Sequence, residues 1–531
     1  MKLYKTYINR YFNVFTLFEI MLITATITSF LIPSLLGKYI DEFTKGNLVI
    51  KELITSFVVV IIINIISLNI QKYLRNTYSN RVTLDIIKDL TEHILKLPMK
   101  FFKEQDMIYL SSRINMDSNN LADFLFKVIS DLFMNIIILC VVVAYIFNID
   151  ISIGIKLFML FPLYIILYKI FEKYLNKYSL EYKEKVNEAF GVMGNQFLNI
   201  KETKINNFYK AYKEKLMEYT DKAQRAIEKY LVSTVLFESI DGIIKNITLL
   251  LLIIYSGNLA VKGALTAGEF TVIIAYFNLA FEALAIIIEF LENYQNAKTS
   301  YERVLEIFET PKEIVGDHIL NSIDSISLKD VSISYNEEKT LFKNLNYDFK
   351  KGNIYCISGE NGRGKSSLLY SILGILEECS GEITYNNKNL TELNLYHIRT
   401  KLISFVAQEP SLVYGTLLEN LTLGTDEYDR KTLLKYCNMF SLNNITKGDF
   451  LEVISGNNLT LSGGEIQKIS ICRALSKGAE LLILDEPTSA LDLKSKETLK
   501  NILLKEKKDK IIIYITHEED FKRVADFILE L

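Results

Sequence analysis

Long apolar segments in the first 290 residues constrain this chain more than any other feature. Such segments occur at residues 14–36, 53–70, 128–149, 151–168, 231–259 and 270–290. A helix of about 20 apolar residues crosses the ~30 Å hydrocarbon core of a bilayer. Within that core, only helices and closed barrels satisfy all their backbone hydrogen bonds. Residues 1–310 are therefore predicted to form an all-α membrane domain with six spanning helices.

The distribution of basic residues predicts how these helices are oriented. Lysine and arginine are frequent in the two long connections, Lys72–Arg113 and Lys169–Lys229, whereas the connection before residue 270 has only Lys262 and the turn at 148–150 has neither. Basic connections stay on the cytoplasmic side, so we expect both termini and both long connections in the cytoplasm. The long connections keep helical periodicity, so the spanning helices should continue into the cytosol.

Charged residues inside the apolar segments are candidates for a cargo path, because charge in hydrocarbon is expensive and usually faces an interior or a cavity. They include Glu19, Glu238, Asp241, Lys245, Glu282 and Glu289. Asp241 and Lys245 are four residues apart on one helix face, so we expect them to neutralise each other. For Glu19, Glu238 and Glu282, a cargo contact and a structural polar contact remain equally open.

The sequence GENGRGKSS at residues 359–367 matches the pattern of a phosphate-binding loop, G-x-x-x-x-G-K-[ST]. An apolar strand is predicted before it at 353–358, and a helix after it at 367–376. A loop between strand and helix directs backbone N–H groups and a helix N-terminus at one point, where a polyanion is the suitable ligand.

The residues of this loop have separate expected roles. Gly359, Gly362 and Gly364 allow the backbone to approach the polyanion closely. Lys365 is expected to reach the β- and γ-phosphates of a nucleotide, and the Ser366 hydroxyl to ligate Mg²⁺.

A second phosphate-related signal is LLILDEP at residues 481–487, an apolar run followed by two acids. A buried strand that ends in Asp485 would hold Mg²⁺ opposite Ser366. Glu486, one residue later, is expected to orient or deprotonate the attacking water.

The motif LSGGE at residues 461–465 narrows the class, since many unrelated ATPases carry a phosphate loop alone. With this motif, the chain resembles an ATP-binding cassette (ABC) transporter of the exporter type. It resembles a half-transporter, with the membrane domain N-terminal to an α/β P-loop nucleotide-binding domain. The resemblance covers nearly the whole chain and implies ATP and Mg²⁺ as cofactors.

The resemblance also implies roles for further residues. Tyr335 would stack on adenine, and Gln408 would sense Mg²⁺ and the water. Residues 489–492 would form the D-loop that ends in Asp492, and His517 would lie near the γ-phosphate. The remaining expected ATP contacts are Asn361, Ser367, Ser462, Gly463, Gly464 and Glu465.

Three departures from the family pattern are visible. MIYL stands at 107–110, where the family often has a glycine-containing GEL. LEVISGNN at 451–458 only loosely matches the loop before the signature, and the chain ends in FILEL, where relatives usually continue. Because the ATP-contacting motifs are complete, we expect these departures to affect regulation or stability more than activity.

The expected organisation is a membrane domain at 1–310, a polar linker at 311–325 and an ATP-binding cassette domain at 326–531. The resemblance implies ATP-driven efflux by a homodimer or related heterodimer, with ATP held between two nucleotide-binding domains. The cargo would be a peptide or an amphiphile. The alternative is a membrane-bound ATP-gated channel or sensor that does not pump.

Other functions fit the sequence less well. With a net charge of −3, the chain has no excess of basic residues that would bind nucleic acid. The apolar segments argue against a soluble ABC ATPase. A peptidase-containing exporter would need a domain before the first segment, which begins near residue 14, so we expect no cargo cutting. The five scattered cysteines fit a reducing cytosol. Frequent Ile, Lys and Asn suggest an AT-rich bacterium, and hence its cytoplasmic membrane.

Overall fold

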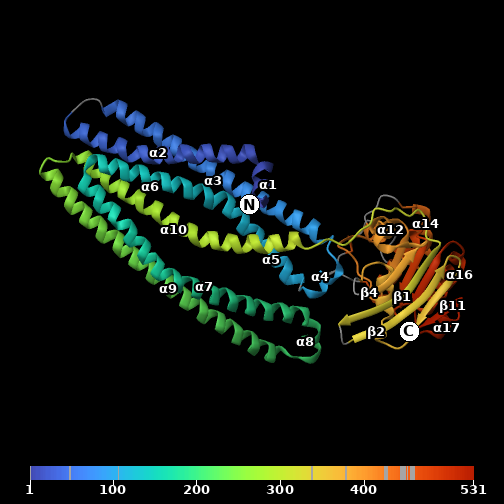
Figure 1. The fold of residues 1–531 in the computed structure, drawn as a ribbon. Helices are drawn as coiled ribbons and strands as arrows, with labels where there is room; N and C mark the ends of the chain where they lie inside the picture. The colour runs from blue at the N-terminus through green and yellow to red at the C-terminus, as the bar shows by residue number, and fades with distance from the viewer. Residues whose placement is uncertain are drawn as a thin grey trace. The chain divides into compact units, whose positions relative to one another are not determined.

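The computed structural model describes residues 2–46, 50–105, 107–336, 339–376, 379–423, 428–442, 450, 453–454 and 461–531. The chain forms two compact units (Figure 1). The first comprises residues 1–92 and 111–309, and the second comprises residues 93–110 and 310–531. The segment 93–110 therefore groups with the C-terminal unit, although the chain enters and leaves it through helices of the first unit.

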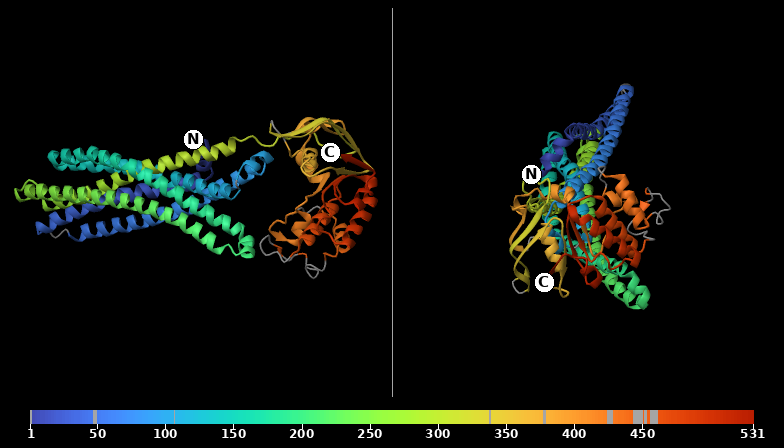
Figure 2. Two further views of the ribbon diagram at one scale, coloured as in Figure 1. Left: turned by 90° about the horizontal axis from the view of Figure 1, so that it is seen from below. Right: turned by 90° about the vertical axis from the view of Figure 1, so that its right-hand side faces the viewer.

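The first unit is built of helices that run roughly side by side (Figures 1 and 2). α7 packs along α9, and α10 packs against both α2 and α6. The helices are α1 (Lys2–Arg10), α2 (Phe12–Thr44), α3 (Ile50–Ile94), α5 (Met107–Asp123), a π-helical turn (Phe124–Val128), α6 (Ile129–Ile149), α7 (Ile151–Leu198), α8 (Ile200–Asn206), α9 (Tyr209–Val261) and α10 (Ala267–Glu309).

Three of these helices are much longer than a membrane crossing. α3, α7 and α9 have 45, 48 and 53 residues, so the apolar segments do continue as helices through the basic connections. The predicted tight turn between the third and fourth segments is also present. There Asp150 caps α7 by accepting a hydrogen bond from the backbone N–H of Ile153 at 2.9 Å.

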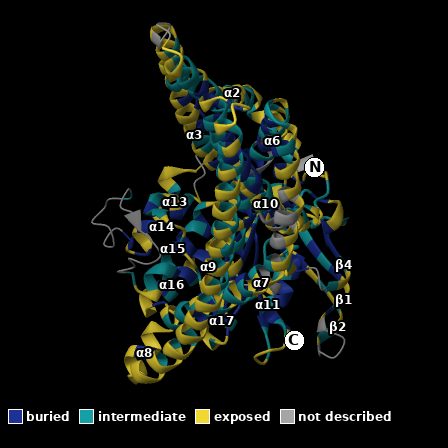
Figure 3. Cartoon of the chain, turned by 90° about the vertical axis from the view of Figure 1, so that its left-hand side faces the viewer, coloured by how far each residue is buried: buried dark blue, intermediate teal, exposed yellow. Residues whose placement is uncertain are grey.

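Within the described residues, five helical stretches are long and apolar enough to cross a membrane; they lie in α2, α3, α5–α6, α9 and α10. The fourth expected segment lies in α7, where several side chains fall outside the described part. Many residues along α3 and α9 are exposed (Figure 3), and apolar residues such as Ile62 and Leu251 are among them. So many exposed apolar side chains are unsuited to water and suit a hydrocarbon environment.

Polar contacts inside the first unit join distant parts of the chain. The Asn64 amide of α3 donates to the carbonyl of Ala25 (3.1 Å) and to the hydroxyls of Thr28 and Ser29 (both 2.9 Å) in α2. By contrast, the ion pair expected between Asp241 and Lys245 is not formed among the described residues. One carboxylate oxygen of Asp241 is buried there without a hydrogen bond, so the two charges do not neutralise each other through direct contact in this structure.

The second unit contains two main sheets. One is antiparallel, in the order β2-β1-β4-β5; the other is parallel, in the order β11-β3-β10-β9-β6. The antiparallel strands are β1 (Ser325–Asn336), β2 (Lys339–Lys350), β4 (Cys379–Tyr385) and β5 (Lys388–Asn389). The parallel strands are β3 (Ile354–Ser358), β6 (Ile403–Val406), β9 (Leu481–Asp485), β10 (Ile511–Ile515) and β11 (Phe527–Glu530).

Helices and a short ribbon complete this unit. The ribbon pairs β7 (Gly415–Thr416) with β8 (Val453–Ile454). The helices are α4 (Met99–Glu104), α11 (Lys365–Ile372), α12 (Leu395–Lys401), α13 (Leu417–Thr422), α14 (Arg430–Met439), α15 (Gly463–Ser476), α16 (Leu493–Glu506) and α17 (Glu519–Lys522), with 3₁₀ turns at Leu390–Glu392 and Lys507–Asp509.

The parallel sheet is buried on both faces, as continuous apolar strands require. Ile513 of β10 belongs to the core that contains α11, and Ile512 belongs to the core that contains α15. β11 pairs with β3 at the edge of this sheet, so FILEL, the last stretch of the sequence, completes the sheet beside the phosphate loop.

Candidate functional site

Strand register brings the predicted ATP-site residues to one edge of the parallel sheet. Ile515, the last residue of β10, lies opposite Ile357 of β3 and Asp485 of β9. The carboxyl ends of the three strands are therefore aligned. The phosphate loop, the Asp485–Glu486 pair and His517 all leave the sheet at this edge, where ligands bind in open α/β sheets.

The glycines of the phosphate loop are required by its geometry. Gly364 has φ +92°, in the left-handed region that favours glycine, and a Cβ there would lie 3.0 Å from Leu341. A Cβ on Gly359 would lie 2.6 Å from the carbonyl oxygen of Leu531. Gly362 also has positive φ (+83°), while Asn361 is an exposed residue of the loop.

α11 begins at Lys365, two residues earlier than predicted, because Gly364 stands at its N-cap in a left-handed conformation. Lys365 is buried, and its ammonium donates to the carbonyls of Gly359 at 2.7 Å and Glu360 at 3.1 Å. The ammonium therefore lies within the loop. Ser367, in the first turn of α11, is also buried.

Asp485 has the surroundings expected of a metal ligand. Its side chain is 3% exposed at the end of β9, and its Oδ1 atom is buried without a hydrogen-bond partner among the described residues. Ser366 hydrogen-bonds to the carboxyl group. Burial raises the pKa of Asp485, the Glu486 charge raises it further, and Ser366 and Lys365 oppose the rise. An orphaned carboxylate oxygen beside a hydroxyl is a donor set that fits Mg²⁺.

Two other predicted catalytic side chains converge on Glu486. Its Oε2 atom accepts a hydrogen bond from the Gln408 amide at 3.2 Å, and its Oε1 atom lies 3.4 Å from Nε2 of His517. These residues come from three separate stretches, and Gln408 lies 78 positions before Glu486. The arrangement can hold a carboxylate in one orientation, as general-base chemistry requires.

The backbone at Glu486 is strained. Its φ is +43°, which is uncommon for a residue with a side chain. Its N–H donates to the carbonyl of Ile515 at 3.1 Å, which anchors it to the end of β10. Strain of this kind persists only where the surrounding structure holds it, and it is often found at functional sites.

The signature residues form a capping box at the start of α15. The Ser462 side chain accepts from the N–H of Glu465, while a Glu465 carboxylate oxygen accepts from the N–H of Ser462 at 2.7 Å. A Cβ on Gly464 would lie 2.7 Å from the carbonyl oxygen of Ala490, so the motif packs closely against the D-loop. Gly463 is the first residue of α15. In the described part of the chain, no hydrogen bond joins Ser462 or Glu465 to the phosphate loop.

Asp492 of the D-loop caps α16 by accepting from the N–H of Ser495 at 2.8 Å. The Lys468 ammonium of α15 lies 2.5 Å from the other Asp492 oxygen. The pKa of Asp492 is lowered to about 2. The main cause is the hydrogen bond from Lys468, and the hydrogen bonds from Ser495 contribute further. The helix that begins at the signature is thus joined to the D-loop by a charged contact.

The structure describes two predicted features only in part. Tyr335 is in β1, but its side chain is not described, so its place against adenine stays a prediction. Most of the stretch 451–458 before the signature is also outside the described part.

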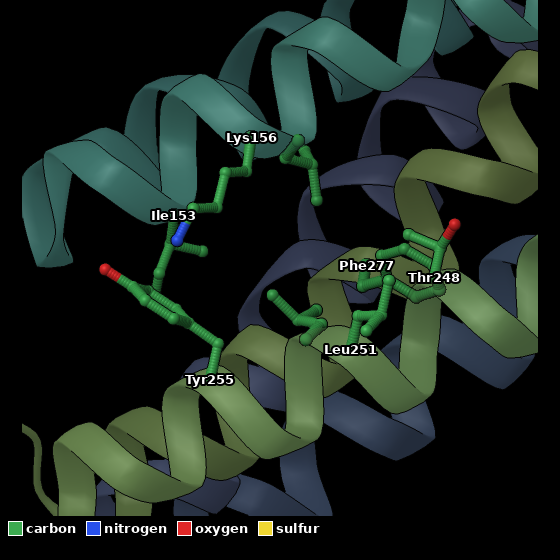
Figure 4. Close-up of a pocket in the computed structure, with 8 residues that line it drawn as sticks. Ile153, Lys156, Thr248, Leu251, Tyr255 and Phe277 are labelled. Carbon is green, nitrogen blue, oxygen red and sulfur yellow. The ribbon is translucent and has the colours of Figure 1, made fainter.

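The membrane unit contains a cavity that was not predicted from the sequence (Figure 4). It has a volume of about 210 Å³ and is lined mainly by apolar side chains of α7, α9 and α10. The Lys156 ammonium lies 3.1 Å from the ring centroid of Tyr255, whose hydroxyl donates to Ser152 at 2.9 Å. Lys156 falls inside the predicted membrane segment 151–168. A charged residue within a membrane segment was therefore the sequence feature that could have indicated this cavity.

Comparison with known proteins identifies the family. The family model "ABC transporter transmembrane region" matches residues 15–284, and the model "ABC transporter" matches residues 342–489. This chain belongs to the ABC transporter family. As predicted, it is an exporter-type member with its membrane domain fused N-terminal to its ATP-binding cassette.

Relatives and solved structures agree with this assignment. The lactococcin-A transport/processing ATP-binding protein of Lactococcus lactis is 27% identical over 512 residues, 92% of this chain and 68% of that protein. The ATP-dependent lipid A-core flippase of Mannheimia succiniciproducens is 24% identical, over 92% of this chain and 85% of that protein. A bacterial Atm1-family ABC exporter with ATP bound has the same fold, with a TM-score of 0.85 at 16% identity over 99% of this chain and 93% of that one.

The family assignment establishes the general activity of this ABC transporter. It is a multi-pass membrane protein that binds ATP and couples ATP hydrolysis to transport. The membrane-domain and nucleotide-binding folds and the ATP-hydrolysing activity agree with what the sequence predicts.

Proposed function

We propose that this ABC transporter is an exporter half-transporter that works as a dimer in a bacterial cytoplasmic membrane. Two nucleotide-binding domains would enclose each ATP between the phosphate loop of one subunit and the signature of the other. In the described part of the chain, Ser462 and Glu465 hydrogen-bond to each other and not to the phosphate loop, which is consistent with this arrangement. The partner would be a second copy or a related half-transporter, and we expect no role for nucleic acid.

The convergence of Gln408 and His517 on the Glu486 carboxylate carries the proposal. In this site, Glu486 accepts a proton from water in line with the γ-phosphate, and Gln408 and His517 orient that carboxylate. Lys365 neutralises charge on the β- and γ-phosphates.

Mg²⁺ would be held by Asp485, Ser366 and Gln408. When bound, it neutralises charge that develops on the phosphates. ATP binding would close the two domains, and closure would switch the membrane helices between inward- and outward-facing states, with hydrolysis resetting the cycle.

We expect the cargo to be a peptide or an amphiphile. The cavity beside Lys156 is smaller than the 300–1,000 Å³ of drug-sized sites, so it would hold only part of a cargo molecule. Its apolar lining suits a hydrocarbon chain, and Lys156 suits a negative group near that chain. No carboxylate forms an ion pair with Lys156 in the described part of the chain.

Transport in inverted membrane vesicles tests the export function directly. Vesicles that contain the wild-type protein should accumulate cargo only with hydrolysable ATP, and the Glu486→Gln variant should not accumulate it. ATP-dependent flux that runs only down a concentration gradient would indicate the alternative, an ATP-gated channel or sensor.

Paired amphiphiles test the cargo contact. Decanoate and decyltrimethylammonium have the same chain length and opposite charge. Lys156→Gln should reduce stimulation of ATPase activity by decanoate, whereas Glu282→Gln should reduce stimulation by the cationic compound if that exposed acid faces cargo. Equal stimulation of both variants and the wild type would contradict a cargo role for either residue.

A further inference from the structure

The segment predicted to be a plain linker forms a partly buried ion pair with Arg399 of α12. Glu313 and Arg399 form a two-pronged contact, with Nη2–Oε1 at 2.5 Å and Nη1–Oε2 at 3.0 Å. Their side chains are only 17% and 22% exposed. A planar, bidentate pair of this kind fixes geometry as well as charge, which a flexible linker does not need.

Arg399 also caps the helix that begins at the phosphate loop. Its Nε atom donates to the carbonyl of Leu373 at 3.0 Å, and its Nη2 atom donates to the carbonyl of Gly374 at 2.7 Å. Leu373 is the C-cap of α11, and Gly374, the next residue, has φ +65°. A guanidinium at a helix C-terminus satisfies its free carbonyls and complements its dipole. Arg399 is therefore attached to the far end of the phosphate-loop helix.

Glu313 is attached on its other side to the segment that follows α3. Its N–H donates to the carbonyl of Lys96 at 2.9 Å, and the neighbouring Thr310 carbonyl lies 3.3 Å from Nε2 of His93. Residues 93–110 belong to the same compact unit as Glu313 and Arg399. α3 contains the second predicted membrane segment, so these contacts lie directly on the chain that leaves the membrane.

The linker backbone supports this position of Glu313. Gly316 donates to the carbonyl of Leu393 at 3.0 Å, and Asn394, the cap of α12, donates to the carbonyl of His318 at 2.8 Å. A Cβ on Gly316 would lie 2.0 Å from the backbone of Glu392, so only glycine fits there. The strap formed by residues 310–318 is therefore held against the start of α12 at several points.

We propose that Glu313 and Arg399 are positioning residues that transmit nucleotide-driven movement of α11 to the end of α3. The route runs from the phosphate loop along α11, through the Arg399 guanidinium to Glu313, and from the Glu313 backbone to Lys96. A movement of α11 displaces the two carbonyls that Arg399 holds, and the rigid pair carries this displacement to the strap. This inference rests on the proposed function, because it concerns how ATP binding reaches the membrane helices.

The test compares ATP hydrolysis with a conformational readout in the full-length protein in nanodiscs. Hydrogen–deuterium exchange is measured with and without trapping by Mg·ATP and vanadate. One set of peptides covers the phosphate loop. Another covers the C-terminal end of α2 at residues 37–46 and the N-terminal end of α10 at residues 263–270. The variants are Glu313→Gln, Arg399→Gln and Arg399→Lys. The last keeps the charge but cannot form the two-pronged contact.

In the wild type, trapping should change exchange in both sets of peptides. In all three variants, trapping should still protect the phosphate loop, and basal ATPase activity should stay within about twofold of the wild type. The change in exchange at residues 37–46 and 263–270 should fall at least about fivefold, which is the lower end of typical coupling between sites. Glu480→Gln is the matched control, because it breaks a similar ion pair to Lys351 (2.7 Å, 26% and 30% exposed) away from this route.

Three outcomes overturn the inference or separate it from the proposed function. A wild-type response at residues 37–46 and 263–270 in the variants would refute the route. An equal loss of phosphate-loop protection, ATPase activity and thermal stability would show a structural role only, and so would a matching defect in Glu480→Gln. If the wild-type protein itself shows no change at these peptides despite ATP hydrolysis, the proposed transport cycle is wrong instead.

Discussion

Replacing Glu486 with glutamine is the sharpest test of the ATP site. The substitution removes a proton acceptor but keeps the size of the side chain, so an amide oxygen still stands within reach of Gln408. A positioned general base contributes about 10²–10⁴-fold to the rate. Because each factor of ten corresponds to about 1.4 kcal/mol of barrier, the loss should raise the barrier by about 3–5 kcal/mol.

ATP binding should be nearly unaffected by this change. Lys365 and Ser366 lie on α11, and neither depends on the Glu486 carboxylate for its place in the loop. Glu486→Gln should therefore bind ATP with almost wild-type affinity, hydrolyse it slowly and accumulate as an ATP-closed dimer. ATP affinity, steady-state turnover and particle mass in detergent or nanodiscs measure these three properties.

The matched control is Glu519→Gln, close in sequence to His517. Glu519 is mostly exposed and, in the described part of the chain, forms an ion pair with Lys522, and exposed pairs of this type contribute little. Its turnover should equal that of the wild type. If Glu486→Gln retains more than about a tenth of wild-type turnover, the loss is outside the range expected for a general base, and water must be activated by another group.

Three further predictions follow from the contacts around the site. Lys365→Ala should lose most ATP affinity, measured by nucleotide titration, because the ammonium that neutralises phosphate charge is removed. Glu465→Gln keeps an oxygen for the capping box and should leave the unfolding midpoint unchanged, whereas Ser462→Ala should lower stability by about 0.5–2 kcal/mol. The pKa of Asp492 is lowered in the folded protein from 3.8 to about 2. Its contribution to stability should be complete above about pH 4 and disappear as the pH falls toward 2, so urea unfolding of wild type and Asp492→Ala should converge across that range.

Much of the ATP site could be predicted from sequence because its chemistry is local. A glycine-rich loop between a strand and a helix, or two acids at the end of an apolar strand, requires particular residue types at fixed spacing. The same is true of the membrane segments, whose length is set by the thickness of the hydrocarbon core. Boundaries were less accurate. α11 starts at Lys365 and ends at Ile372, because the local conformations of Gly364 and Gly374 decide its limits.

The sequence alone also suggested contacts that the fold does not make. Asp241 and Lys245 have the spacing of an ion pair, yet no such pair is formed among the described residues. Spacing along a helix permits a contact, but the rotamers and the packing of neighbouring helices determine whether it forms. The same limit applies to residues 311–325, whose polar composition indicated a linker and gave no sign of the ion pair with Arg399.

Taken by itself, the sequence determined that the chain has apolar helices for a membrane, a phosphate loop, and a carboxylate pair at the end of a strand. Only the tertiary structure decided that Gln408 and His517 meet at Glu486, that Glu313 joins Arg399, and that Lys156 lies over Tyr255. The physical reason is that each of these contacts joins residues from separate elements, and strand register and helix packing, rather than spacing along the chain, bring them together.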